Sequence, residues 1–105
     1  MNTNTRVTIR RAERAKRQQS DMGLPGSGVD HALLNDLPAY LDILDYEMTI
    51  LHEAENHVVT DICIIRGKRD VEPGDTLIDG KSKREYDVLK VKPYPNQTEL
   101  MLESI

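Results

Sequence analysis

The most strand-like part of the sequence is Val58-Val-Thr-Asp-Ile-Cys-Ile-Ile65. Most of its residues are β-branched, and such side chains favour extended backbone, so it predicts the strongest strand of the chain. Alternation along a strand gives it two faces: Val58, Thr60, Ile62 and Ile64 on one, and Val59, Asp61, Cys63 and Ile65 on the other. We predict that the first face is buried and that Ile62→Asp prevents folding, because it would bury an unpaired charge.

Shorter strand-like runs lie on both sides of this stretch, at residues 5–10, 39–44, 46–51, 77–78, 86–91 and 98–103. The part from 39 to 51 fits either two strands or one short helix. In the last run Leu100 and Leu102 alternate with Glu99, Met101 and Glu103. Short strands at a spacing of about 8–12 residues are typical of all-β domains. The sequence therefore predicts a mainly β fold, a small antiparallel β-barrel or sandwich with a long N-terminal loop excursion.

The turns between these runs are visible as well. Pro73-Gly74 favours a type II turn, and Asp79-Gly80 is a hairpin signal that would leave residues 81–84 as a polar tip. Residues 93–96, which hold two prolines, predict the last turn.

Length and composition limit the chain to one thin core. Its 105 residues suit a single domain at 1–105, with a basic N-terminal arm and flexible loop at about 1–37. Aromatic residues make up 4% of the chain, with no Phe and no Trp, so the core depends on aliphatic side chains and tyrosines. We expect such a subunit to gain stability by burying more surface in an assembly.

Charge is distributed unevenly along the chain. Residues 1–20 hold six basic residues and one acidic residue, a net charge of +5; since the whole chain carries -4, the remainder carries -9. A basic arm on an acidic body predicts contact with something anionic, either a nucleic acid or the acidic face of a neighbouring subunit. The candidate interface residues are Arg6, Arg10, Arg11, Arg14 and Arg17. A solvated, frayed terminus is the structural alternative.

No motif calls for catalysis, a cofactor or a metal. Gly23, Gly26 and Gly28 fit neither common phosphate-loop spacing. No serine lies in a nucleophile elbow, and we expect no enzyme activity. His52 and His57 lack a third credible ligand, so we interpret them as surface histidines in a turn.

The remaining sequence features concern redox state and localisation. Cys63, the single cysteine, lies in an apolar stretch and predicts a buried, unreactive thiol. No run is long and apolar enough for a membrane helix, and residues 1–20 lack the apolar core of a secretory signal, so we expect no membrane partner.

The order of the motifs points to a family. Thr5-Arg-Val-Thr-Ile-Arg10, a long variable loop, Pro38-Ala39-Tyr40, Arg66-Gly, Val71-Glu-Pro-Gly-Asp-Thr-Leu-Ile-Asp-Gly80, Tyr86-Asp-Val-Leu-Lys-Val91 and Glu99-Leu100 follow one another over roughly residues 5–103. This pattern resembles the head-closure (stopper), or head-tail adaptor, proteins of tailed bacteriophages, also called head-tail joining proteins. Its most specific part is P-G-D-x-L-I-D-G followed by Y-x-V-x-x-V.

The resemblance implies a structural role in the virion neck. The expected partners are copies of the chain in a twelve-fold ring, the portal or adaptor protein, a tail-completion protein and the packaged double-stranded DNA in the channel. Such a ring helps to retain DNA in the filled head and provides the surface for tail attachment; it is assembled in the cytoplasm of the bacterial host. Two excursions, residues 11–37 and 53–57, are candidates for the loop that faces the channel. We favour the longer one, which contains Gly23, Pro25, Gly26 and Gly28.

Two other functions stay open at this point. One is a small nucleic-acid-binding barrel, such as an OB-fold or SH3-like module, that uses residues 6–17 as its electrostatic contact. Against it, single-strand binders usually stack bases on aromatic side chains in a basic groove, whereas this chain is acidic beyond residue 20. The other is a different phage neck or tail-completion protein.

Overall fold

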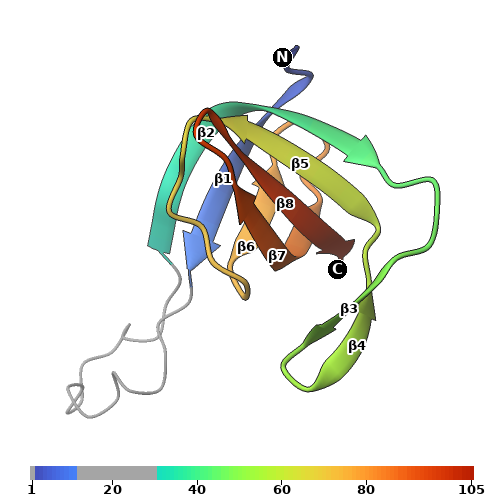
Figure 1. The fold of residues 1–105 in the computed structure, drawn as a ribbon. Coiled ribbons are helices and arrows are strands. Elements are labelled where there is room, and N and C mark those ends of the chain that lie inside the picture. Colours follow the sequence, from blue (N-terminus) through green and yellow to red (C-terminus); the bar gives the residue numbers. More distant parts are fainter. Residues whose placement is uncertain (1, 12–30) are drawn as a thin grey trace, which may run out of the picture.

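The computed structural model describes residues 2–11 and 31–105 and contains eight strands and no helix in that part of the chain. The strands are β1 (Thr5–Arg11), β2 (His31–Ile43), β3 (Thr49–His52), β4 (Glu55–Val58), β5 (Asp61–Arg66), β6 (Thr76–Asp79), β7 (Glu85–Pro93) and β8 (Gln97–Ser104). Six of them close into an antiparallel barrel in the order β1-β2-β5-β8-β7-β6, with β6 returning to β1 (Figure 1). The predicted mainly β fold is thus confirmed, as a barrel rather than a sandwich.

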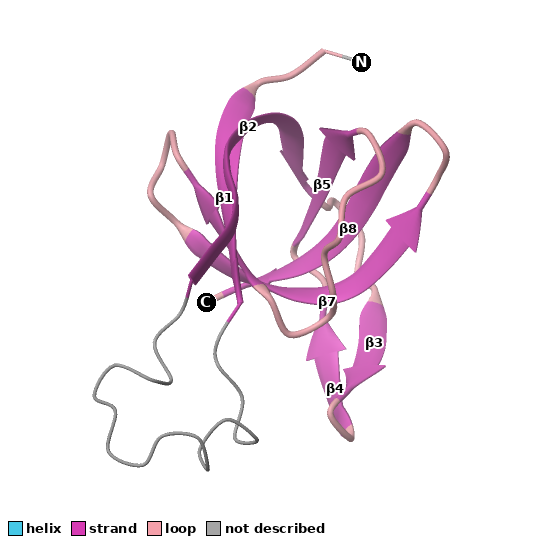
Figure 2. Ribbon diagram, turned by 90° about the vertical axis from the view of Figure 1, so that its left-hand side faces the viewer, coloured by secondary structure: helices cyan, strands magenta, loops and turns pink. Residues whose placement is uncertain are grey.

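The remaining two strands form a separate hairpin. β3 pairs with β4 from Thr49↔Val58 to His52↔Glu55, and this two-stranded sheet projects from one end of the barrel (Figures 1 and 2). Glu53 and Ala54 at its tip have φ angles of 54° and 63°. We call residues 43–58, which comprise the last residue of β2, the following loop and the hairpin, the β3–β4 lobe.

The barrel interior is filled by alternate residues of every strand. Val7 and Ile9 of β1, Leu77 of β6, and Leu100 and Leu102 of β8 are at most 1% exposed. Ala39, Cys63, Ile65, Tyr86, Val88 and Val71 complete the same cluster. Burying apolar surface at about 25 cal/mol per Å² is the main term that holds such a barrel closed.

A second, smaller cluster joins the lobe to the outside of the barrel. It contains Val59, Leu89 and Met101, and Leu44, Met48 and Ile50 pack against it. Leu89 lies at a bulge in β7, which turns its side chain away from the interior. Met101, which the alternation of β8 placed on the polar side, is 4% exposed because the lobe covers it.

The prediction about the central stretch was wrong in two ways. It is not one strand, since β4 ends at Val58 and β5 begins at Asp61. The buried face is also the opposite one: Cys63 and Ile65 point into the core, whereas Ile62 and Ile64 are only half-buried. Both faces are apolar, so alternation could not decide between them; the outer isoleucines find partial cover opposite Tyr40 and Met101.

The start of β2 differs from the sequence prediction as well. The strand begins at His31, not near Pro38, because its first half pairs with β1 as far as Arg11↔His31. Asn35-Asp36 resembles a loop in the sequence. In the structure the pairing of β1 with β2 shifts register here, so that β2 has a bulge in which Asp36 has a φ of 55°. Between 39 and 51 the two-strand alternative holds and the helix does not, with β3 displaced to Thr49–His52.

The predicted turns are confirmed. The amide of Asp75 donates to the carbonyl of Glu72 at 3.1 Å across Pro73-Gly74, and Gly74 has the positive φ, 98°, that a type II turn needs. After Asp79, residues 80–84 form the tip between β6 and β7. Gly80 is required there, because a Cβ would lie 2.9 Å from the carbonyl oxygen of Arg6.

Candidate interaction surfaces

The predicted interface arginines do not form a free arm in the part that the structure describes. Arg6, Arg10 and Arg11 lie in β1, within the barrel wall. Arg14, Arg17 and the predicted channel loop with Gly23, Pro25, Gly26 and Gly28 lie outside the described residues. Predictions about these two groups therefore stay predictions.

Arg11 is bound within the molecule. Its Nε and Nη2 donate to the two carboxylate oxygens of Asp75 at 2.9 and 3.0 Å, and Nη2 also donates to the carbonyl of Asp70. The hydrogen bond with Asp75 raises the pKa of Arg11 above its usual value. Asp75, whose side chain is 4% exposed, also accepts from the amide of Glu72. This pair fastens the end of β1 to the 72–75 turn and leaves Arg11 little capacity for an external anion.

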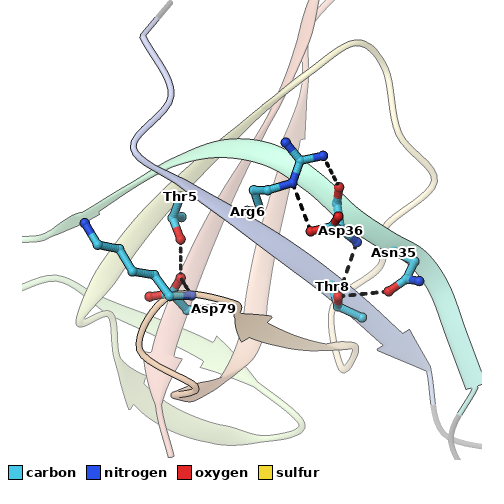
Figure 3. Close-up of polar contacts among 7 residues, drawn as sticks. Thr5, Arg6, Thr8, Asn35, Asp36 and Asp79 are labelled. Carbon is cyan, nitrogen blue, oxygen red and sulfur yellow. Dashed lines mark hydrogen bonds and ion pairs between the residues drawn. The ribbon is translucent and has the colours of Figure 1, made fainter.

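Arg6 belongs to a polar groove on the outer face of β1 (Figure 3). Its Nε donates to the Asp36 carboxylate at 2.9 Å and its Nη2 to the Asp36 carbonyl at 2.8 Å. Thr8 bridges Asn35 and the Asp36 amide, so the bulge of β2 is held by side chains of β1. The groove has a volume of about 630 Å³ and is lined by Thr5, Arg6, Thr8, Asn35, Asp36, Gly80, Lys81 and Lys83.

Asp79 anchors the far side of this groove (Figure 3). It accepts hydrogen bonds from the hydroxyls of Thr5 and Ser82 and from the amide of Lys81. Burial alone would raise the pKa of Asp79, but these hydrogen bonds and one from the Ser82 amide outweigh it and lower the pKa. Asp79 has a structural role, because its carboxylate accepts hydrogen bonds from residues of the 80–84 tip.

A second depression lies on the other side of β2. It has a volume of about 330 Å³ and is lined by Thr3, Leu37, Pro38, Arg66 and Arg69. We call it the arginine pocket. Arg69 is oriented by its Nε, which donates to the carbonyl of Arg66 at 3.0 Å, and by its amide, which donates to Thr98 Oγ1. The pocket thus combines two guanidinium groups with an apolar wall.

The β3–β4 lobe carries the opposite charge. Between residues 41 and 65 the chain has no Lys and no Arg, and the lobe itself holds Asp45, Glu47, Glu53 and Glu55, all exposed. Large apolar side chains are exposed beside them: Ile43 (73%), Leu51 (69%), Tyr46 (58%) and Val58 (43%). The lobe is therefore an acidic surface that also holds four of the six large apolar side chains exposed among the described residues.

The two histidines of the lobe make contacts within the protein. They lie in β3 and β4 rather than in the turn itself, with ring centroids 5.8 Å apart. His57 Nδ1 is 2.7 Å from Glu103 Oε1 of β8, so it links the lobe to the barrel. The hydrogen bond with Glu103 raises the pKa of His57 above its ordinary value. No group of three or more potential metal ligands occurs in residues 2–11 and 31–105.

Cys63 confirms its sequence interpretation. Its side chain is fully buried in the barrel core, and burial raises the pKa of the thiol to about 12. A thiol that stays protonated is a poor nucleophile, so Cys63 acts as a small apolar core residue.

Sequence reasoning missed both the lobe and the arginine pocket as surfaces. A signal for the lobe was present, because residues 18–65 contain none of the 14 Lys and Arg residues of the chain and the lobe adds four carboxylates to that run. The pocket had no such signal, since it brings together residues 3, 37–38 and 66–69. No protein-family model and no curated protein matches the chain. Within the described ranges, no helix could span a membrane.

Proposed function

We propose that this chain is a structural protein of the neck of a tailed bacteriophage, where copies of it form a ring between the portal or adaptor and the tail. The ring closes the filled head, surrounds the double-stranded DNA in its channel and offers the surface to which the tail attaches. The proposal starts from the motif order described above. Its most specific part, residues 73–91, forms the turn, strand and hairpin that build β6 and β7.

The observation that carries the proposal is the β3–β4 lobe. Each of the six barrel strands has two neighbours, although residues 31–38 of β2 pair with β1 alone. The lobe, in contrast, keeps Ile43, Tyr46 and Leu51 more than half exposed. Exposed apolar side chains that gather on one projecting element support a role for the lobe in binding another protein. A small barrel with one projecting contact element suits a subunit that works in an assembly.

Two of the arginines predicted as an anion contact favour this reading over a nucleic-acid module. Arg6 and Arg11 are engaged with Asp36 and Asp75, whereas phosphate contacts need available cationic side chains. The exposed tyrosines do not form a stacking platform either: Tyr46 lies in the acidic lobe, and Tyr94 lies in the turn after β7.

The test of this function is a particle assembled without the chain. We expect heads that package DNA but lose it, together with tails that stay unattached; supplying the chain in trans restores tailed particles. Stable, tailed particles in its absence would contradict the proposal. Heads that retain DNA but still lack tails would instead indicate another neck or tail-completion protein.

A DNA-binding assay distinguishes the proposed neck function from the nucleic-acid module. We expect the purified full chain to show no steep salt dependence of DNA binding, because few phosphates are neutralised. Tight binding with a steep loss of affinity at raised salt, removed by deletion of residues 1–20, would support the nucleic-acid module.

A further inference from the structure

Two surfaces of complementary chemistry lie at opposite ends of one strand pair. β2 and β5 are paired from Ala39↔Ile65 to Ile43↔Asp61. At the first end, Leu37, Pro38 and Arg66 line the arginine pocket. At the second end, Ile43 begins the β3–β4 lobe. Figures 1 and 2 both show the N-terminal end of the chain and the lobe at opposite ends of the molecule.

The pocket is suited to bind carboxylates beside apolar groups. A guanidinium binds a carboxylate with two parallel hydrogen bonds, and Leu37 and Pro38 supply an apolar wall next to both arginines. Among the described residues, no carboxylate forms an ion pair with Arg66 or Arg69. The pocket therefore holds two cationic groups without an anionic partner in that part of the chain.

The lobe has the matching features. Its four carboxylates are exposed, and they alternate along the chain with Tyr46 and Leu51, which are 58% and 69% exposed. A contact between the two surfaces would pair opposite charges around a centre of apolar burial, which is the usual organisation of a specific interface. One chain cannot bring its own lobe to its own pocket, because the barrel separates them.

We propose that the lobe of one copy docks into the arginine pocket of the next copy. The contact is heterologous, so it repeats in one direction. It closes into the ring of the proposed function where the rotation between successive copies divides a full turn evenly. The β2–β5 pair of each copy then lies along the circumference of the ring. This inference rests on the proposed function for the ring itself, and it adds which surfaces meet and how each barrel is oriented.

Sedimentation of the purified full chain at micromolar to millimolar concentration tests the contact. We expect the average mass of the wild type to rise beyond that of a dimer. A pocket variant, Arg66→Glu with Arg69→Glu, and a lobe variant, Leu51→Asp, each weaken self-association by about 100-fold, because they remove charge-assisted hydrogen bonds or the apolar centre. Lys81→Glu with Lys83→Glu is the matched control; it makes the same charge change elsewhere and leaves association as in the wild type.

Mixing the two variants makes the test directional. The pocket variant keeps an intact lobe, and the lobe variant keeps an intact pocket, so an equimolar mixture forms dimers that cannot extend. Dimer formation also proves that both variants are folded. A wild type that stays monomeric at millimolar concentration, a wild type that stops at the dimer, or a mixture that does not associate would each overturn the proposal.

The proposed contact and the proposed neck function can fail separately. If the chain associates in this way but particles lacking it are intact, the contact stands and the neck function fails. If the particles lose DNA but the pocket and lobe variants restore them fully, the neck function stands and this contact fails.

Discussion

The barrel and the β3–β4 lobe differ in how their strands are stabilised. In the barrel every strand has two neighbours, and interior residues such as Leu77 and Leu100 are fully buried. The lobe has two four-residue strands and one small cluster beneath it, while Leu51 stays 69% exposed. An isolated hairpin is marginally stable at best in water. The barrel therefore supplies most of the stability, and the lobe is held by the small cluster that joins it to the barrel.

The sharpest way to test this difference lies within β5. Ile65→Asp puts an unpaired charge into the barrel core, and we expect the chain not to fold. Ile62→Asp, on the half-buried outer face, should fold with a loss of about 1–2 kcal/mol. Circular dichroism and urea unfolding of both variants check this. An unfolded Ile62→Asp together with a folded Ile65→Asp would reverse the assignment of the faces.

Truncation of leucines compares the two regions directly. Leu100→Ala leaves a cavity in the barrel and should lower the free energy of unfolding by about 2–5 kcal/mol. Leu51→Ala in the lobe should change it by no more than about 0.5 kcal/mol, because the side chain is largely in solvent. Chemical denaturation at one pH measures both values. Equal losses would mean that the lobe is part of the cooperative core.

The ion pair at the end of β1 should have a smaller effect. Arg11→Met leaves the buried Asp75 carboxylate without its cation, and we expect a loss of about 1–3 kcal/mol. Arg6→Met is the matched control, because its partner Asp36 is 69% exposed; exposed pairs contribute about 0–1 kcal/mol. Urea unfolding at low and high salt distinguishes the two. A larger loss for Arg6→Met would contradict this ranking.

The smallest expected effect concerns the link between the regions. Because the pKa of His57 is raised by Glu103, its contribution to stability is fully present below the ordinary His pKa of 6.5 and is lost as the pH rises through its folded value. The lobe should thus be held most firmly on the acidic side. Proton NMR titration should show the His57 pKa falling towards its ordinary value in Glu103→Gln. An unmoved His57 titration would exclude this link.

Local patterns predicted the barrel better than the surfaces. The Pro73-Gly74 turn and the tip after Asp79 depend on neighbouring residues, so the sequence was sufficient to find them. The strands beside β5 decide which of its faces is buried in the core. Both faces are apolar, so the alternation of residues along the sequence could not show which one it is. The same holds for β2, whose polar bulge at Asn35-Asp36 is explained only by its pairing with β1.

The candidate surfaces show the same limit more strongly. Charge counting predicted an interface at the arginines near the N-terminus, but it could not show that Arg11 is bound by Asp75, 64 residues away. The arginine pocket joins three distant segments, so no window of sequence contains it. Contacts over such separations are decided by barrel closure, which is a property of the whole chain.

Cryo-electron microscopy of the virion neck would reveal the proposed ring and its subunit contact in one experiment. We expect a ring of small barrels between the portal assembly and the tail, with each β3–β4 lobe seated against Arg66 and Arg69 of the adjacent copy. A neck without density for this barrel would contradict the proposed function.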